Sequence, residues 1–211
     1  MKTVLFQGDS ITDCGRNKES EINMAAHLGF GYPNLVGGKL LFDHAGEMYR
    51  CINKGISGNR VVDLYARWKI DALNFSPDVI SILIGVNDVW HEVSRQNGVE
   101  NERFEQIYRM LLEWTKTVLP DVKLILMEPF ALLSDVVDDD FLAEVKMRAA
   151  VVKKLAGEFN AVFLPLQEKF DAAAQQTNNC YWLYDGVHPS PAGHRLIADS
   201  WLEAAKPLLE D

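Results

Sequence analysis

One serine near the start of the chain and one histidine near its end have the residue types needed for acyl transfer. Ser10 follows a short apolar run that ends in Gly8 and Asp9, and His188 lies three residues after Asp185. A serine is a weak nucleophile unless a base removes its proton, and histidine is the usual base. A turn of this length can place the Asp185 carboxylate beside the imidazole Nδ1, which leaves Nε2 for the serine. The three residues therefore predict a Ser-His-Asp triad.

Three further groups have the chemistry to stabilise an oxyanion by hydrogen bonding. Gly58 lets the main chain approach a ligand because it lacks a Cβ, Asn87 offers a neutral amide, and the backbone N–H of Ser10 is the third donor. Each residue alone has an ordinary explanation, Ser10 as a helix cap, Gly58 as a turn glycine and Asn87 as part of an Asx-turn or cap. Their joint occurrence after successive apolar runs favours an esterase site.

The residues after His188 predict a stiff turn and a helix start. Pro189 keeps His188 out of helical geometry, Ser190 is a typical N-cap, and Pro191 is a typical first helical residue. His188 is therefore expected just before the last helix, which suits a base that needs a fixed orientation.

The elements that must position these residues alternate between short apolar runs and amphipathic stretches, which predicts a parallel sheet with helices on both faces. Residues 79–84 are almost continuously apolar and rich in β-branched side chains, as in a strand covered on both faces. Helical spacing recurs in residues 104–118 and 141–155. Because ligands bind outside the carboxyl ends of parallel strands, the candidate groups are expected at one sheet edge. The predicted strands are residues 3–6, 49–53, 79–84, 123–127 and 161–164.

Length, composition and charge restrict the classes of function. The 211 residues, 48% hydrophobic and 24% charged, are typical of a soluble globular protein, and we expect residues 1–211 to form one domain. The net charge of -9 argues against a nucleic-acid or anionic-membrane partner and favours a small neutral substrate.

Cysteine usage and the lengths of the apolar runs bear on the compartment. The three cysteines form no CxxC pair, which predicts free thiols in a reducing compartment and no structural zinc. No apolar run is long enough for a signal peptide or a membrane span, so we expect a cytoplasmic protein without a membrane partner. The acidic run Asp138-Asp139-Asp140 predicts a helix start and not a metal site.

The motif blocks resemble those of the SGNH hydrolases, also called GDSL esterases. They occur in order as Gly8-Asp9-Ser10, Asn53 to Asn59, Gly85-Val86-Asn87-Asp88 and Asp185-Gly186-Val187-His188-Pro189, with Ile11 where the family name has leucine. The resemblance implies a flavodoxin-like α/β/α sandwich with a parallel five-stranded sheet. It also implies Ser10 as nucleophile, His188 as base and Asp185 as orienting acid, with Ser10, Gly58 and Asn87 forming the oxyanion hole. Ser10 lies in no GxSxG motif, so the strained elbow of the α/β-hydrolases is not expected.

A narrower resemblance is to intracellular acetylxylan esterases that deacetylate xylo-oligosaccharides. It is carried by the stretches 8–16, 53–59, 84–90 and 187–194 and by Ala66-Arg67-Trp68. This resemblance implies hydrolysis of O-acetyl esters of short saccharides without a metal or organic cofactor. It also suggests a homo-oligomer, because assembly is known among such enzymes.

Four residues near the motif blocks are candidate substrate contacts. Trp90, His91 and Tyr184 offer aromatic faces and neutral polar groups for a sugar, although Trp90 is equally compatible with the core. Arg60 can hold a substrate hydroxyl, but pairing with an acidic side chain is the favoured interpretation for it and for Arg16.

The sequence offers three alternatives to the acetylesterase. A lysophospholipase or acyl-thioesterase would use the same machinery and would need an apolar acyl channel. A non-catalytic saccharide-binding protein is disfavoured because every catalytic position is filled. Dinucleotide binding fails on its motif, because residues 29–33 lack the third glycine and do not follow a strand.

Overall fold

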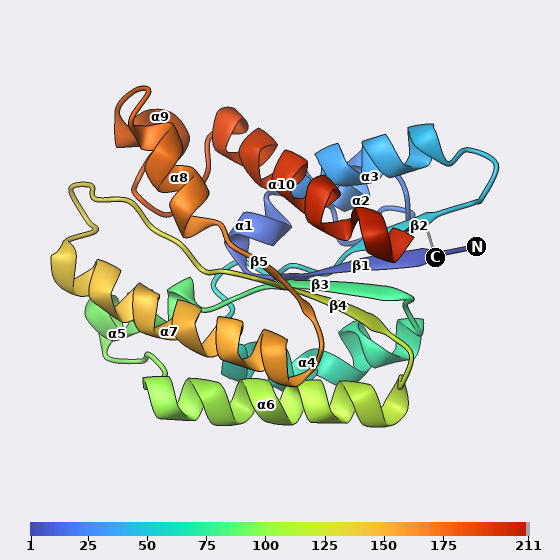
Figure 1. Cartoon of the computed structure of the whole chain (residues 1–211), viewed down its shortest axis with the longest axis horizontal. Coiled ribbons are helices and arrows are strands. Elements are labelled where there is room, and N and C mark those ends of the chain that lie inside the picture. Colours follow the sequence, from blue (N-terminus) through green and yellow to red (C-terminus); the bar gives the residue numbers. More distant parts are fainter. Residues whose placement is uncertain (210–211) are drawn as a thin grey trace.

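Five parallel strands form one sheet in the order β2-β1-β3-β4-β5 (Figure 1). The computed structural model describes residues 1–209. The parallel five-stranded sheet expected from the sequence is confirmed, and β1 extends beyond its predicted end at Phe6 as far as Gly8. The strands are β1 (Thr3–Gly8), β2 (Arg50–Asn53), β3 (Val79–Leu83), β4 (Lys123–Met127) and β5 (Val162–Leu164).

Helices cover both faces of the sheet, which gives the predicted three-layer α/β/α arrangement (Figure 1). One face carries α1 (Ser10–Asp13), α2 (Ala25–Leu28), α3 (Tyr32–Asp43), α8 (Gln167–Ala174), α9 (Asn179–Trp182) and α10 (Pro191–Leu209). The other face carries α4 (Val61–Asp71), α5 (Val86–Arg95), α6 (Asn101–Val118) and α7 (Asp139–Glu158), with a 3-10 turn at Leu73–Phe75.

Alternate side chains of the strands supply two hydrophobic cores. Val4 and Phe6 belong to the cluster shared with α3 and α10, whereas Leu5 belongs to the cluster shared with α4 and α6. Each core contains a fully buried tryptophan whose indole N–H has a partner, Trp201 to the Ser81 hydroxyl at 2.8 Å and Trp68 to a threonine hydroxyl at 2.8 Å. Burial of such large side chains stabilises the fold by about 1.5–3 kcal/mol each.

Two helix starts predicted from the sequence are confirmed. Asp138 caps α7 by accepting a 2.8 Å hydrogen bond from the Phe141 N–H, so the acidic run opens a helix. The last helix begins at Pro191, and the Ser190 hydroxyl accepts a 3.2 Å hydrogen bond from the Gly193 N–H. Both caps satisfy backbone donors that the first helical turn leaves unpaired.

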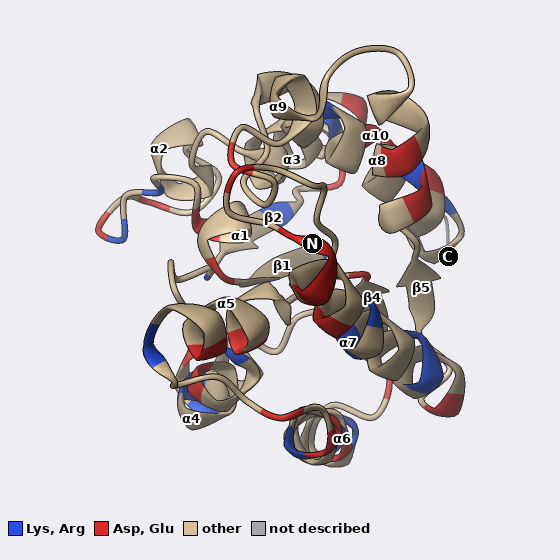
Figure 2. Cartoon of the chain, turned by 90° about the vertical axis from the view of Figure 1, so that its left-hand side faces the viewer, with Lys and Arg blue, Asp and Glu red and all other residues tan. Residues whose placement is uncertain are grey.

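The strand order makes the carboxyl edge of the sheet the expected place for a ligand. The chain runs from β1 to β2 on one side, while β3 lies on the other side of β1, so the order reverses around β1. Loops after such neighbouring strands diverge and leave room for a ligand. Figure 2 looks onto this edge, with α1 near the middle and α5, α9 and α10 around it. Within residues 1–209, no helix has the length and apolarity required to cross a bilayer.

Candidate active site

Ser10 is positioned by the turn that joins β1 to α1. β1 ends at Gly8, Asp9 is the N-cap, and Ser10 is the first residue of α1. The Asp9 carboxylate accepts a 3.0 Å hydrogen bond from the Ile11 N–H, which holds the turn. The half-buried Ser10 side chain therefore lies at the carboxyl end of β1, between β2 and β3.

His188 and Asp185 lie in the tight loop between α9 and α10. One oxygen of Asp185 accepts from the backbone N–H groups of Val187, at 3.0 Å, and His188, at 2.8 Å. A bridge between Leu183 and Pro189 closes the loop. These two backbone hydrogen bonds orient the carboxylate, and its second oxygen is left for the imidazole.

The structure brings Ser10, His188 and Asp185 together. The second Asp185 oxygen lies 2.7 Å from His188 Nδ1, and His188 Nε2 lies 2.9 Å from the Ser10 hydroxyl oxygen. An ionised carboxylate only accepts hydrogen bonds, so Nδ1 carries the proton and Nε2 is free to accept from the serine. Burial would raise the pKa of Asp185, but hydrogen bonds from the His188 N–H, its imidazole and the Val187 N–H outweigh it and lower the pKa. The carboxylate is therefore ionised at neutral pH.

The three candidate oxyanion donors follow three neighbouring strands: Ser10 begins α1, Gly58 lies between β2 and α4, and Asn87 lies in the first turn of α5. Gly58 has a φ of 82°, a left-handed conformation that favours glycine. Among the described residues, no acceptor is found for the backbone N–H of Ser10 or of Gly58. The Asn87 amide donates one hydrogen bond to the Asn59 carbonyl at 3.2 Å, and its NH₂ group has a second proton to give.

Two acidic side chains tie the segments that carry these donors to one another, a role that the sequence did not indicate. Asp13 of α1 accepts from the Ser57 N–H at 3.0 Å and from the Ser57 hydroxyl at 3.1 Å. Asp88 of α5 accepts from the Val61 N–H, at 3.1 Å, at the start of α4. Both partners are far away in sequence, so no local pattern pointed to these contacts.

Two buried carboxyls beside the site titrate well above their usual range. Burial raises the pKa of Asp9 to about 6 and that of Asp88 to about 7, although each accepts a backbone hydrogen bond that opposes the shift. Negative charge next to Ser10 is therefore suppressed below about pH 6. Within residues 1–209, no group of three or more His, Cys, Asp or Glu side chains is arranged to hold a metal ion.

Two of the predicted substrate contacts flank the imidazole. The Tyr184 ring stacks on His188 with centroids 5.7 Å apart, and 60% of the tyrosine is exposed. Trp90 is half-buried, and its ring meets His188 edge-on at 6.3 Å and Phe141 at 5.7 Å. It therefore packs on the core and also borders the site.

The other two predicted contacts are more enclosed. Only 9% of His91 is exposed, and burial, then Arg95 and Arg60, lower its pKa, which keeps the ring neutral. The Arg60 guanidinium donates to Asp63, which agrees with the expected pairing with an acidic side chain, and it also donates to Asn97. Its proposed contact with substrate stays a prediction.

Comparison with known proteins assigns the chain to a family. Residues 6–196 match the GDSL-like Lipase/Acylhydrolase family. An acetylxylan esterase from Geobacillus stearothermophilus is 36% identical over 203 residues, which cover 94% of this chain and 91% of that protein. The chain belongs to the GDSL-like lipase/acylhydrolase family. It is a carboxylic ester hydrolase with the SGNH hydrolase fold.

Solved structures of GDSL hydrolases superpose over almost the whole chain. A GDSL-like lipase from Parabacteroides merdae is 42% identical with a TM-score of 0.94, covering 97% of this chain and 95% of its own. The Geobacillus acetylxylan esterase has a TM-score of 0.88, covering 96% and 93%. Catalytic mutants of that esterase replace a serine, an aspartate and a histidine by alanine.

Proposed function

We propose that this GDSL hydrolase is a serine acetylesterase that removes O-acetyl groups from short saccharides such as acetylated xylo-oligosaccharides. The observation that carries the proposal is the chain of contacts from Ser10 through His188 to Asp185, at 2.9 and 2.7 Å. The relative with 36% identity, an acetylxylan esterase, supports the choice of acetyl esters. In that relative the aspartate and histidine of the catalytic mutants are three positions apart, as Asp185 and His188 are.

The proposed reaction proceeds in two half-reactions. His188 Nε2 takes the proton of Ser10 while the serine oxygen attacks the acetyl carbonyl, and Asp185 stabilises the resulting imidazolium. The N–H groups of Ser10 and Gly58 and the Asn87 amide donate to the oxyanion. When the tetrahedral intermediate collapses, the imidazolium protonates the departing sugar oxygen, which leaves an acetylated Ser10. A water molecule that gives its proton to His188 then releases acetate and restores the serine.

The surroundings of His188 suit a sugar leaving group. Tyr184 presents an exposed aromatic face next to the imidazole, and aromatic faces stack on sugar rings. The net charge of -9 is compatible with a neutral saccharide and unfavourable for an anionic phospholipid. A cytoplasmic location and a homo-oligomeric state also remain proposals.

The decisive test is acetate release by the wild type beside a Ser10→Ala variant. We would assay acetylated xylo-oligosaccharides and p-nitrophenyl esters from acetate to octanoate. We expect release from the sugars, acetate as the best aryl ester, and no turnover by the correctly folded Ser10→Ala variant. Undiminished activity of that variant would overturn the role of Ser10. A preference for long acyl chains with inert sugars would instead favour a lysophospholipase or acyl-thioesterase with the same triad.

A further inference from the structure

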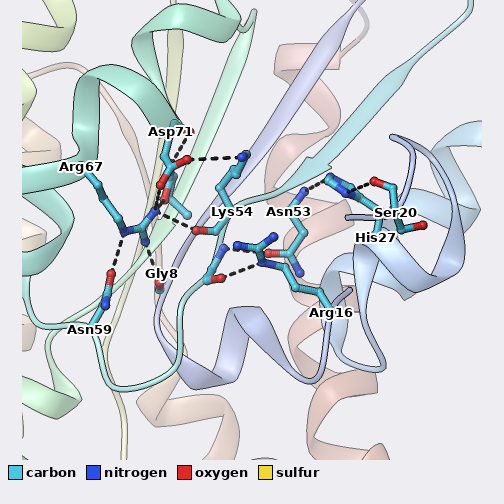
Figure 3. Close-up of polar contacts among 11 residues, drawn as sticks. Gly8, Arg16, Ser20, His27, Asn53, Lys54, Asn59, Arg67 and Asp71 are labelled. Atoms are coloured by element: carbon cyan, nitrogen blue, oxygen red, sulfur yellow. Dashed lines mark hydrogen bonds and ion pairs between the residues drawn. The ribbon is translucent and has the colours of Figure 1, made fainter. Parts of the chain in front are cut away.

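The guanidinium of Arg67 is the centre of a polar network beneath the site (Figure 3). Arg67 lies on α4, and only 13% of its side chain is exposed. Because a guanidinium has five N–H donors in a fixed plane, one such group can tie several chain segments together. Its acceptors are the Asn59 side chain at 2.7 Å, the Lys54 carbonyl at 2.9 Å, the Gln7 side chain at 3.0 Å, Asp71 at 3.2 Å and the Gly8 carbonyl at 3.3 Å.

Three of these acceptors lie close in sequence to Ser10 or Gly58: Gly8 at the end of β1, and Lys54 and Asn59 between β2 and α4. Gly8 lies two residues before Ser10, and Asn59 directly follows Gly58. The Asn59 backbone carbonyl, in turn, accepts from the Asn87 amide at 3.2 Å. Arg67 is thus linked to the nucleophile turn directly, to Gly58 through the neighbouring residue, and to Asn87 through one further hydrogen bond.

Other residues hold the first half of the same loop, whereas in its second half Arg67 acts beside the 3.1 Å hydrogen bond from the Asn59 N–H to the Ile56 carbonyl and the contact with Asn87. Arg16 donates to the Gly55 carbonyl at 2.7 Å, and the Gly55 N–H donates to the Asn53 side chain at 2.9 Å (Figure 3). Ser57 is held by Asp13, as described above. Within the described residues, the Asn59 side chain has one hydrogen bond, the one from Arg67. Arg67 is therefore the group that fixes the side chain of the residue next to Gly58.

We propose that Arg67 is a positioning residue of the oxyanion hole, which acts by fixing Asn59 and so aiming the Gly58 N–H and the Asn87 amide. This inference rests on the proposed function, because it assigns those two groups to the oxyanion. A donor is effective only about 2.7–3.1 Å from the charged oxygen, and a displacement of about 1 Å can reduce the rate about 100-fold. Asp71, which also lies 3.3 Å from Lys54, neutralises part of the buried charge and keeps the guanidinium in place.

The test compares Arg67→Lys and Arg67→Met with the wild type on p-nitrophenyl acetate. We expect kcat to fall about 10–100-fold while KM changes less than about threefold. Misplaced donors reduce the stabilisation of the transition state more than they reduce the binding of the ester. A purely structural role would reduce the amount of folded enzyme and leave kcat per folded molecule unchanged. Folded enzyme is therefore quantified by circular dichroism. Arg67→Lys keeps a cation near Asp71 and serves as the measured variant if Arg67→Met does not fold.

The matched control is Lys116→Met, which removes another cation that holds a loop. Lys116 donates to the Val122 carbonyl at 2.7 Å, just before β4 and at the opposite edge of the sheet from Ser10. We expect its kcat to stay within about twofold of the wild type, since no donor of the oxyanion hole depends on it.

A double-mutant cycle tests whether Arg67 acts through Asn59. Asn59→Ala removes the side-chain acceptor and keeps the backbone carbonyl that holds Asn87. We expect Asn59→Ala to lower kcat, and we expect the Arg67→Lys/Asn59→Ala double variant to be no slower than the slower single variant. Additive effects would overturn the route through Asn59.

Two results separate this proposal from the function on which it rests. Arg67 variants with wild-type kcat, together with an inactive Ser10→Ala, would overturn the role of Arg67 and leave the serine esterase standing. A fully active Ser10→Ala would overturn both, because the oxyanion hole would then have no substrate oxygen to bind.

Discussion

Two histidines six residues apart each contact a nucleophilic side chain near the start of the chain. His188 contacts the Ser10 hydroxyl, and His194, on the first turns of α10, lies 3.4 Å from the Cys14 thiol. The two rings differ in the partner of Nδ1. His188 Nδ1 donates to the Asp185 carboxylate, whereas His194 Nδ1 accepts from the Tyr32 N–H at 3.2 Å.

This difference decides which ring can act as a base. Because His194 Nδ1 accepts a hydrogen bond, its proton lies on Nε2, so the ring donates to Cys14 and has no lone pair there to take the thiol proton. Burial first, and then the charge of His188, lower the pKa of His194 to about 4, while burial raises the pKa of Cys14. A nucleophile beside a histidine is therefore not sufficient for catalysis, since the group on the other ring nitrogen sets the tautomer.

The largest expected contrast comes from the same substitution at both rings. We expect His188→Asn to lower kcat about 10⁵-fold, because removal of a catalytic histidine disables the whole triad. His194→Asn, whose amide oxygen can still accept from the Tyr32 N–H, is expected to stay within about threefold of the wild type. Acetate release by equal amounts of folded enzyme measures both. Comparable losses in the two variants would show that the two rings are not functionally distinct.

Removal of the partner of Nδ1 gives the next largest effect. Asp185→Asn keeps the shape of the side chain and removes the charge, so His188 is expected to lose the productive tautomer and kcat to fall about 10⁴-fold. Cys14→Ser, which changes the corresponding nucleophile of the second pair, is expected to alter kcat less than about twofold. An Asp185→Asn variant as active as Cys14→Ser would contradict the role assigned to the carboxylate. Steady-state kinetics on p-nitrophenyl acetate are suitable for both.

The smallest expected effect is a pH dependence of stability that arises from His194. Its pKa of about 4 in the folded protein lies below the ordinary value of 6.5, so the unfolded chain binds the extra proton between these pH values. Protonation therefore favours unfolding, and this contribution of His194 to the free energy of unfolding decreases by up to about 3 kcal/mol as the pH falls from 6.5 to 4.

Comparison with His194→Asn isolates this contribution from that of Asp9 and Asp88. Their raised pKa values change the free energy of unfolding in the opposite direction as the pH falls. We would measure urea unfolding of the wild type and His194→Asn at several pH values between 4 and 7. The free energy of unfolding of the wild type, relative to the variant, is expected to decrease as the pH falls. A difference that does not change with pH would show that His194 titrates alike in the folded and unfolded states.

Local patterns in the sequence predicted the five strands and the helices α6, α7 and α10. The apolar run 123–127 became β4 without a change of bounds, and the turn at Pro189 led into a helix at Pro191 as expected. The motif blocks also indicated the family and the ester hydrolase activity. Such features depend on backbone propensity and on the pattern of buried residues. A few consecutive residues are enough to indicate both.

The sequence singled out His188 because Asp185 lies three residues before it, but it revealed neither the contact between His194 and Cys14 nor the role of Arg67. Ser10 and His188 are 178 residues apart. Two acceptors of Arg67, Gly8 and Gln7, precede it in the chain by 59 and 60 positions. These contacts form because the strand order brings the loops after β1, β2 and β3 to one edge while α10 packs beside α1. Tautomers and hydrogen-bond networks depend on distances between such remote segments, which no local pattern encodes.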